Sequence, residues 1–145
     1  MEMISLTLRQ EYKYVAGLAC LISVYCVVIG FCSGARRRSL FSDQFMKKHF
    51  GDEHAKYCKG AALPKQGYPD CGSGIYSQKL SYKDWLQFNE DQRAHKAFLE
   101  QVTIAVFSIL VSGLIRHEWA IGLGICYLLN RVACTFSHRV YPNAR

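Results

Sequence analysis

Residues 88–115 read F-N-E-D-Q-R-A-H-K-A-F-L-E-Q-V-T-I-A-V-F-S-I-L-V-S-G-L-I, a polar helical pattern that continues without a break into an apolar one. At helical spacing Arg93, Ala97 and Glu100 share one face of this helix. Residues 101–115 carry no charge. Ionisable groups at membrane depth are costly and usually mark a site, a pathway or a helix-helix contact. The stretch therefore predicts a helix whose charged face reaches the edge of a membrane span.

Two further apolar segments lie on either side of this helix. Residues 14–35 carry no charge over 22 residues, which is enough to cross a hydrocarbon core of about 30 Å at about 1.5 Å per residue. A third candidate, residues 119–138, is interrupted by Arg131. We expect an all-α fold, an integral membrane helix bundle in a single domain over residues 1–145. Its three spans are expected at about 14–35, 97–115 and 119–138, with a long polar loop over 36–80 between the first two helices.

Local signals predict where the helices begin and end. The first helix is expected to start near Leu6–Gln10 and to end near Ser33–Gly34, because a glycine followed by arginines suits a helix C-terminus. Ser81 and Asp84 form a pattern like a capping box, so the second helix is expected to start there and to run about 34 residues, or about 51 Å. Residues 39–59 have a weak helical period, which fits an interfacial helix or a solvated connecting helix. Three glycines are of the kind that lets membrane helices approach closely: Gly113, Gly122 and Gly124.

The net charge of +7 is distributed unevenly along the chain. Residues 36–93 hold 11 Lys/Arg and 7 Asp/Glu, and three arginines near the C-terminus add the remainder. The N-terminal tail and the short turn around residue 117 are neutral in sum. The positive-inside rule predicts that the 36–93 loop and the C-terminus lie on one side and the N-terminus on the other. Because topology accounts for the basic charges, we do not expect a nucleic-acid partner.

The seven cysteines do not form a convincing metal motif. Five of them lie in the expected spans, where they serve as small apolar side chains. Cys58 and Cys71 lie in the loop, where His49 and His54 complete a pattern that matches no zinc site well. We expect free thiols and no metal, and a Cys58–Cys71 disulfide would require an oxidising compartment.

The charged residues of the spans allow two interpretations. In the first, Glu100 forms a structural intramembrane ion pair with Arg131 or Arg93, since an unpaired charge is costly in lipid. In the second, these groups form a cationic pocket for a small anionic ligand, because the guanidinium fork of arginine suits carboxylates. Tyr127 lies one turn before Arg131 and either adds a hydroxyl donor or packs at a helix interface. No set of residues predicts a catalytic triad or a carboxylate pair.

Taken together, these residues resemble the MAPEG family, the membrane-associated proteins in eicosanoid and glutathione metabolism. The helix signature of that family is approximately F-x-R-x-x-R-A-Q-x-N-x-x-E, and Phe88 to Glu100 follows its spacing. The glycine ending at Ser112-Gly113 and the pattern Gly124-x-x-Tyr127-x3-Arg131 are also similar to the family. So are the arginines after the first span, whereas the long first loop indicates a branch with an extended loop.

The resemblance implies a trimer of four-helix subunits that binds glutathione between subunits. It further implies that the tripeptide would be contacted by Arg37, Arg93, Glu100, Tyr127 and Arg131. In such a site an arginine stabilises the glutathione thiolate, since an adjacent cation lowers the pKa of a thiol.

The chain departs from the family pattern at several of its polar positions. Ala97 stands where the signature has Asn, and Gln101 stands where an aromatic residue is usual. Cys134 and His138 replace two expected tyrosines, and the sequence ends at Arg145, where the family continues into a fourth span. The chain thus keeps the charged residues of the family's ligand site but lacks several of its polar side chains. This pattern favours a structural role for the charged residues that remain.

The first functional hypothesis is therefore a non-catalytic structural or accessory subunit of a larger membrane complex, such as a mitochondrial respiratory-type assembly. The alternative is a glutathione-dependent membrane transferase or peroxidase that conjugates glutathione to lipophilic electrophiles, and a third is a lipid-binding protein. Either way we expect a multi-pass protein of the mitochondrial or endoplasmic reticulum membrane. Its expected partners are lipids and either other membrane subunits or two further copies of itself.

Overall fold

The computed structural model describes residues 10–140, with side chains described through residue 137. This part of the chain is helical and contains no strand. Two long helices, α1 (Tyr12–Leu40) and α3 (Tyr82–Ile115), are followed by α4 (His117–Val140). The connection between α1 and α3 holds α2 (Asp43–Tyr57) and two single turns of 3-10 helix, η1 (Lys65–Gly67) and η2 (Ser77–Lys79).

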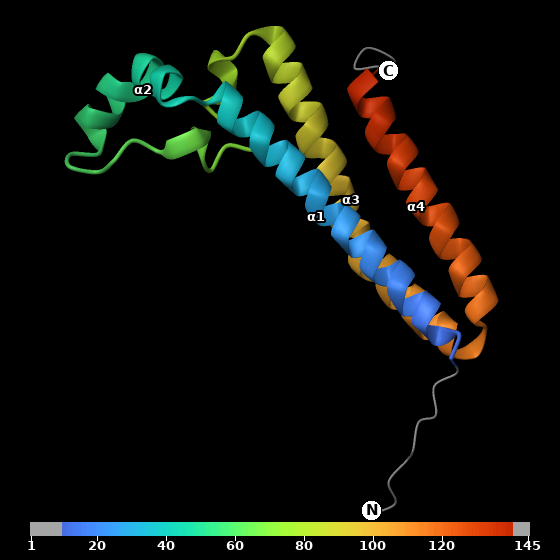
Figure 1. Ribbon diagram of the computed structural model, residues 1–145. Helices are drawn as coiled ribbons and strands as arrows, with labels where there is room; N and C mark the ends of the chain where they lie inside the picture. Colours follow the sequence, from blue (N-terminus) through green and yellow to red (C-terminus); the bar gives the residue numbers. More distant parts are fainter. Residues whose placement is uncertain (1–9, 141–145) are drawn as a thin grey trace, which may run out of the picture.

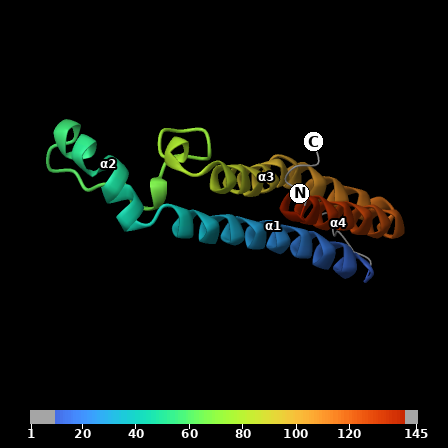
Figure 2. The same cartoon turned by 90° about the horizontal axis from the view of Figure 1, so that it is seen from above.

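The three long helices form an elongated bundle in which α1 packs along α3 and α4 packs against both (Figures 1 and 2). All three are long and apolar enough to cross a membrane, over Tyr12–Leu40, Tyr82–Ile115 and His117–Ser137. The predicted fold class, a helical membrane bundle with three spans and a long loop after the first, is confirmed. The connection with α2 and the C-terminal end of α4 lie at one end of the bundle, and α1 begins at the other (Figure 1). This arrangement agrees with the sidedness that the charge pattern predicts.

The helix α3 confirms its predicted start and length. The Ser81 side-chain oxygen accepts a hydrogen bond from the backbone N–H of Asp84 at 3.2 Å, which satisfies a donor that the first helical turn would leave unpaired. From there the helix runs for 34 residues to Ile115, as the sequence pattern predicts. Polar and apolar halves of the stretch that opens at Phe88 are thus one continuous helix.

The prediction for the end of α1 is wrong. The helix continues past Ser33–Gly34 to Leu40, and the backbone N–H of Phe41 caps it by donating to the Arg37 carbonyl at 3.0 Å. Gly34 stays helical because the turn after it is held by side chains from distant parts of the chain. At the other end α1 begins at Tyr12, and most of the predicted start near Leu6–Gln10 lies outside the described residues.

The core inside the bundle is narrow and is made of residues from all three long helices. Its buried apolar side chains are Val15, Ile22, Cys26, Ile29, Phe98, Ile109 and Ala120. A Cβ on Gly113 would lie 2.6 Å from a Val15 methyl carbon, and one on Gly124 would lie 2.5 Å from a Leu18 methyl carbon. The predicted close approach is confirmed at these two glycines. At Gly122 it is not, since a Cβ there meets nothing within 4 Å.

A second, smaller core joins the end of α1 to the connection and to the start of α3. It contains Phe41, Met46, Phe50 and Phe88, with Tyr76 and Leu80 packed against it. The helix predicted within residues 39–59 is confirmed as α2, which Ser42 caps through its side-chain oxygen. It projects sideways from the bundle (Figure 2).

Candidate functional site

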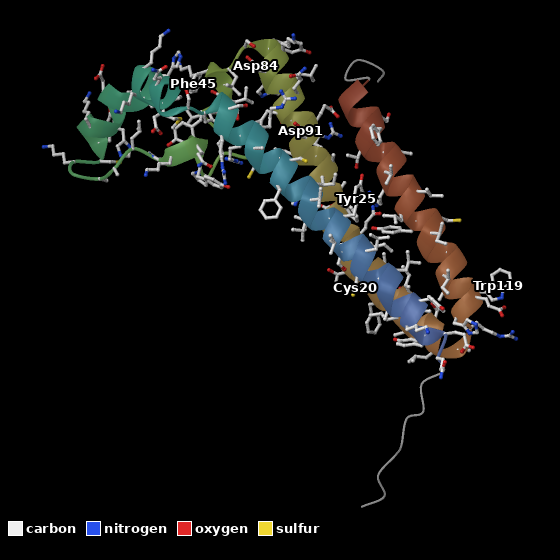
Figure 3. The ribbon with its side chains drawn as sticks, viewed as in Figure 1. Cys20, Tyr25, Phe45, Asp84, Asp91 and Trp119 are labelled. Carbon is white, nitrogen blue, oxygen red and sulfur yellow. The ribbon has the colours of Figure 1, made fainter. Side chains whose placement is uncertain are left out.

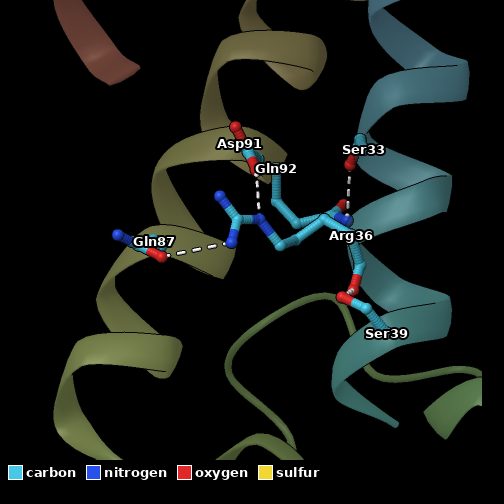
Figure 4. A network of polar contacts seen from close by, with 6 residues as sticks. All are labelled: Ser33, Arg36, Ser39, Gln87, Asp91 and Gln92. Atoms are coloured by element: carbon cyan, nitrogen blue, oxygen red, sulfur yellow. Dashed lines mark hydrogen bonds and ion pairs between the residues drawn. The ribbon is translucent and has the colours of Figure 1, made fainter. Parts of the chain in front are cut away.

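The basic end of α1 contacts the polar first half of α3 through hydrogen bonds and one ion pair. Arg36 donates from Nε to an Asp91 carboxylate oxygen at 3.3 Å and from Nη1 to the Gln87 side-chain oxygen at 3.2 Å (Figure 4). One turn earlier, the Gln92 side-chain amide donates to the Ser33 hydroxyl at 2.8 Å. These contacts hold the two helices together where the apolar core ends.

Arg37, the predicted glutathione ligand on α1, is enclosed by the loop. Its side chain lies against the rings of Tyr68 and Phe88, with the guanidinium carbon 4.3 Å and 5.3 Å from their centroids. Nη1 also donates to the Gly67 carbonyl at 3.4 Å, and the residue is only 4 % exposed. A guanidinium in this setting joins α1, the loop and α3, and it has no open side toward a ligand.

The face of Arg93, Ala97 and Glu100 exists on α3 as predicted, but it points outward. Arg93 and Glu100 are exposed, and Ala97 is half-buried. Neither charged side chain forms a hydrogen bond or an ion pair with another residue in the described part of the chain. The face is therefore accessible to lipids or to a neighbouring chain in the membrane.

Arg131 lies on the inner side of α4, over aromatic rings. Its guanidinium carbon is 5.5 Å from the centroid of Phe98 and 5.3 Å from that of Tyr127, distances at which a cation is attracted to a ring face. The Tyr127 hydroxyl is buried and has no hydrogen-bond partner among the residues described. The predicted common face of Tyr127 and Arg131 is confirmed.

The single chain does not form the predicted ion pair between Glu100 and Arg131. Phe98, which Arg131 contacts, is buried toward α1 and α4, and Glu100 follows it by two residues. Two residues correspond to about 200° around a helix, so Glu100 points away from Arg131. Of the ion pairs between described residues, Arg36–Asp91 joins two helices and His117–Glu118 joins neighbours in sequence.

A carboxylate that the sequence analysis did not single out organises the loop. One Asp70 oxygen accepts from the backbone N–H groups of Gly72 and Gly74 at 2.7 Å and 2.9 Å, and the other accepts from Ser77 at 2.7 Å. Burial alone would raise the pKa of Asp70, but the hydrogen bonds from Ser77, Gly72 and Gly74 outweigh it and hold that pKa below its ordinary value. An Asp followed by closely spaced glycines was the available signal.

The loop that Asp70 organises is tied to the start of α3. The Trp85 indole N–H and the Asn89 amide both donate to the Gly72 carbonyl, at 3.1 Å and 3.0 Å. Trp85 lies in the first turn of α3 and Trp119 in the first turn of α4, so the two indole rings belong to opposite ends of the bundle. Trp119, at the turn between α3 and α4, is 69 % exposed (Figure 3).

The described cysteines and histidines do not gather into a metal site. All seven cysteines are free thiols, and Cys58 and Cys71 are both exposed. Over the residues that the structure describes, no group of three or more His, Cys, Asp or Glu side chains has the arrangement of a metal site.

The described site residues thus fall into three places. Arg37 lies among the contacts that join α1, the loop and α3, Arg93 and Glu100 lie on the outer face of α3, and Tyr127 and Arg131 lie on the inner side of α4. Comparison with curated proteins and with solved structures gave no significant match. A family model, that of the MAPEG family, matches residues 13–145. This match covers the three long helices, the loop and every residue of the candidate site. Its extent shows that the chain is a membrane protein belonging to the MAPEG family.

Proposed function

We propose that this MAPEG-family protein is a non-catalytic accessory subunit of a larger membrane assembly, in a mitochondrial or endoplasmic reticulum membrane. The observation that carries the proposal is the position of Arg37. A buried arginine that already contacts Tyr68, Phe88 and the Gly67 carbonyl is a structural residue. Its neighbour Arg36 forms an ion pair with Asp91.

The remaining polar positions also fit a structural role. Ala97 has no side chain that can hydrogen-bond to a ligand, although it stands between Arg93 and Glu100 on their common face. Arg131 lies on a different side of the bundle from that face, over Phe98. The charges that one chain offers a peptide ligand therefore form two separate sets on different sides of the bundle.

The outer surface of the bundle fits a subunit surrounded by lipid and by neighbouring chains. Large apolar side chains are exposed on all three long helices, among them Phe31, Phe107, Leu123 and Phe136. Exposed charges next to such a surface, as at Glu100, are costly in lipid unless another chain supplies a partner. The proposed partner is another membrane subunit.

A glutathione-dependent transferase or peroxidase is the second candidate, and one observation favours it. Arg93 and Glu100 have no partner in the described chain and share one open face of α3. In a homotrimer this face would meet a neighbouring copy, and the two chains together would surround a tripeptide. An arginine beside the glutathione sulfur would then favour the thiolate.

Glutathione binding to the detergent-purified protein separates the two candidates. We expect calorimetry to show no binding that depends on Arg93, no conjugation of 1-chloro-2,4-dinitrobenzene above the uncatalysed rate, and co-migration with a large complex on native gels of solubilised membranes. The decisive variant is Arg93→Ala, and Lys96→Ala on the same helix is its control. Binding in the micromolar-to-millimolar range that Arg93→Ala abolishes and Lys96→Ala retains would overturn the proposal, as would an active homotrimer.

A further inference from the structure

The first turns of α3 stand clear of the bilayer. The exposed charges of Lys96 and Arg116 bound the apolar part of this helix, and the distance between them along the axis is about 30 Å, the thickness of the hydrocarbon core. Tyr82, where α3 begins, lies about 21 Å beyond Lys96 at 1.5 Å per residue. The headgroup region on each side of a bilayer is only about 5–8 Å thick. Lipid headgroups therefore do not cover the start of α3.

This end of the molecule nevertheless exposes large apolar side chains. Tyr82 is 75 % exposed, although its ring stacks on that of Trp85 at a centroid distance of 5.9 Å. Ile75, in the loop before α3, is 57 % exposed. The Trp85 indole donates to the Gly72 carbonyl at 3.1 Å and so joins the stacked rings to that loop. Four exposed residues define what we call the end surface: Ile75, Lys79, Tyr82 and Lys83.

The backbone below the end surface is fixed by the chain's own contacts. Asp70 holds the loop through the backbone N–H groups of Gly72, Gly74 and Ser77, and the Asn89 amide donates to the Gly72 carbonyl. A surface that is ordered in advance loses less conformational entropy when a partner binds. Loops that a rigid scaffold holds in place commonly carry binding residues.

The end surface carries positive charge that the chain does not neutralise. Lys79 and Lys83 are exposed, and neither forms an ion pair with another described residue. The adjacent carboxylate, Asp84, accepts a hydrogen bond from the Ser81 hydroxyl at 2.7 Å. Lys83 lies in the first turn of α3, where a cation is unfavourable because a helix N-terminus carries partial positive charge. Helix stability therefore does not account for this lysine, whereas an anionic group on a partner would.

We propose that the end surface binds an acidic, partly apolar segment of a neighbouring subunit outside the membrane. The inference rests on the proposed function of an accessory subunit and names the surface by which this subunit attaches. Carboxylates of the segment contact Lys79 and Lys83, and its apolar side chains pack on Tyr82 and Ile75. A second copy of the chain is not the occupant, because a symmetric contact would bring two surfaces of like charge together. The bilayer is excluded by its distance from Tyr82.

Native gels of digitonin-solubilised membranes test the charge contact, with each variant expressed in place of the natural protein. We expect Lys83→Glu to lower the fraction that co-migrates with the large complex at least tenfold, since it places like charges face to face. The same change removes an unfavourable cation from the first turn of α3, so the thermal unfolding midpoint should equal or exceed that of the wild type. Lys48→Glu, which changes an exposed lysine on α2, is the control and should stay in the complex.

The aromatic contact has its own pair of variants. Tyr82→Ala should also lower the fraction in the complex at least tenfold, because truncating an aromatic residue at the centre of an interface is costly. Tyr57→Ala, which removes a tyrosine 77 % exposed on α2, should leave that fraction unchanged. Light-activated p-benzoylphenylalanine in place of Tyr82 should cross-link to a segment of another protein with net negative charge, and 0.5 M salt should weaken this cross-link by screening.

Three results would overturn the inference and leave the proposed function standing. The first is a wild type that stays in the complex together with Lys83→Glu and Tyr82→Ala. The second is a cross-link from position 82 to lipid alone, and the third is a cross-link to a second copy of the chain or to a basic segment. A wild type that migrates only as a homotrimer would instead overturn the proposed function, and the inference with it.

Discussion

The polar end of the molecule and its membrane half are held together in different ways. At the polar end, directional contacts join α1, the loop and α3, through Arg36 to Asp91, Arg37 to the Gly67 carbonyl, and Asp70 to three backbone N–H groups. In the membrane half, the three long helices meet through apolar side chains and two glycines, around a thin core.

This difference indicates which end of the protein has groups that only lipids or other chains can contact. The polar end satisfies its own arginines at positions 36 and 37 and its own buried carboxylate. The membrane half leaves Arg93, Glu100 and most of its apolar surface open. Lipids and the helices of partners are therefore expected to bind the membrane half, and the polar end keeps the geometry of the helices that present it.

Removing the Asp70 carboxylate should have the largest effect. Asp70→Ala leaves three backbone N–H groups without their acceptor, and unsatisfied buried donors cost about 1–3 kcal/mol each. We expect a loss of roughly 3 kcal/mol or more in loop stability, seen as rapid tryptic cleavage at Lys65 and Lys79. Asp52→Ala, which changes an exposed carboxylate on α2, is the control. Equal cleavage of both variants would show that Asp70 does not organise the loop.

The second test adds a methyl group at the helix crossing of the membrane half. In Gly113→Ala the new Cβ meets Val15, a buried β-branched side chain with little freedom to move. Overpacking of this kind costs about 1–3 kcal/mol, so the thermal unfolding midpoint in detergent should fall. Gly122→Ala, on α4 and open within 4 Å, should leave the midpoint unchanged or slightly higher. A midpoint for Gly113→Ala equal to that of Gly122→Ala would contradict the close approach of α1 and α3.

Loss of the Arg36–Asp91 ion pair should cost less stability than Asp70→Ala or Gly113→Ala. It is partly exposed on the arginine side, with side-chain exposures of 40 % and 13 %, so solvent screens it. A double-mutant cycle with Arg36→Gln and Asp91→Asn should give a coupling free energy of about 0.5–1 kcal/mol. A coupling free energy near zero would show that this ion pair does not contribute to the stability of the contact between α1 and α3.

The smallest effect is expected from mild acidification. The pKa of Asp70 in the folded protein lies below its ordinary value, which is about 3.9 in the unfolded chain. The stabilisation by this carboxylate is therefore complete above about pH 5 and is lost as the pH falls through the folded pKa. Protection of the loop from hydrogen exchange should be constant from pH 7 to about pH 5 and should fall at lower pH, after correction for the intrinsic exchange rate. The Asp70→Asn variant should lack this acid-dependent fall.

Sequence reasoning succeeded where the deciding contacts are local. The start of α3 depends on Ser81 and Asp84, three residues apart, and its length depends on the absence of a breaker before Gly113. The prediction for the end of α1 failed because that end is stabilised from afar. Arg36 finds its partner 55 residues away, and Arg37 finds the Gly67 carbonyl 30 residues away. Local signals such as Gly34 cannot report such contacts.

The candidate site divides in the same way. Helical spacing alone placed Arg93, Ala97 and Glu100 on one face, and Tyr127 with Arg131 on another, and both faces exist. The pairing of Glu100 with Arg131 depends on how α3 and α4 are rotated against each other. In the bundle, Phe98 occupies the inward position that the pairing would require of Glu100.

The sequence by itself determined that this is an all-helical membrane protein of three long apolar helices with a MAPEG-like charged face, because charge, hydropathy and helical period are properties of neighbouring residues. Only the tertiary structure decided that Arg37 is a structural residue and that Glu100 points away from Arg131. Each of these facts depends on contacts between segments far apart in the chain, and the rotation and depth of packed helices set those contacts.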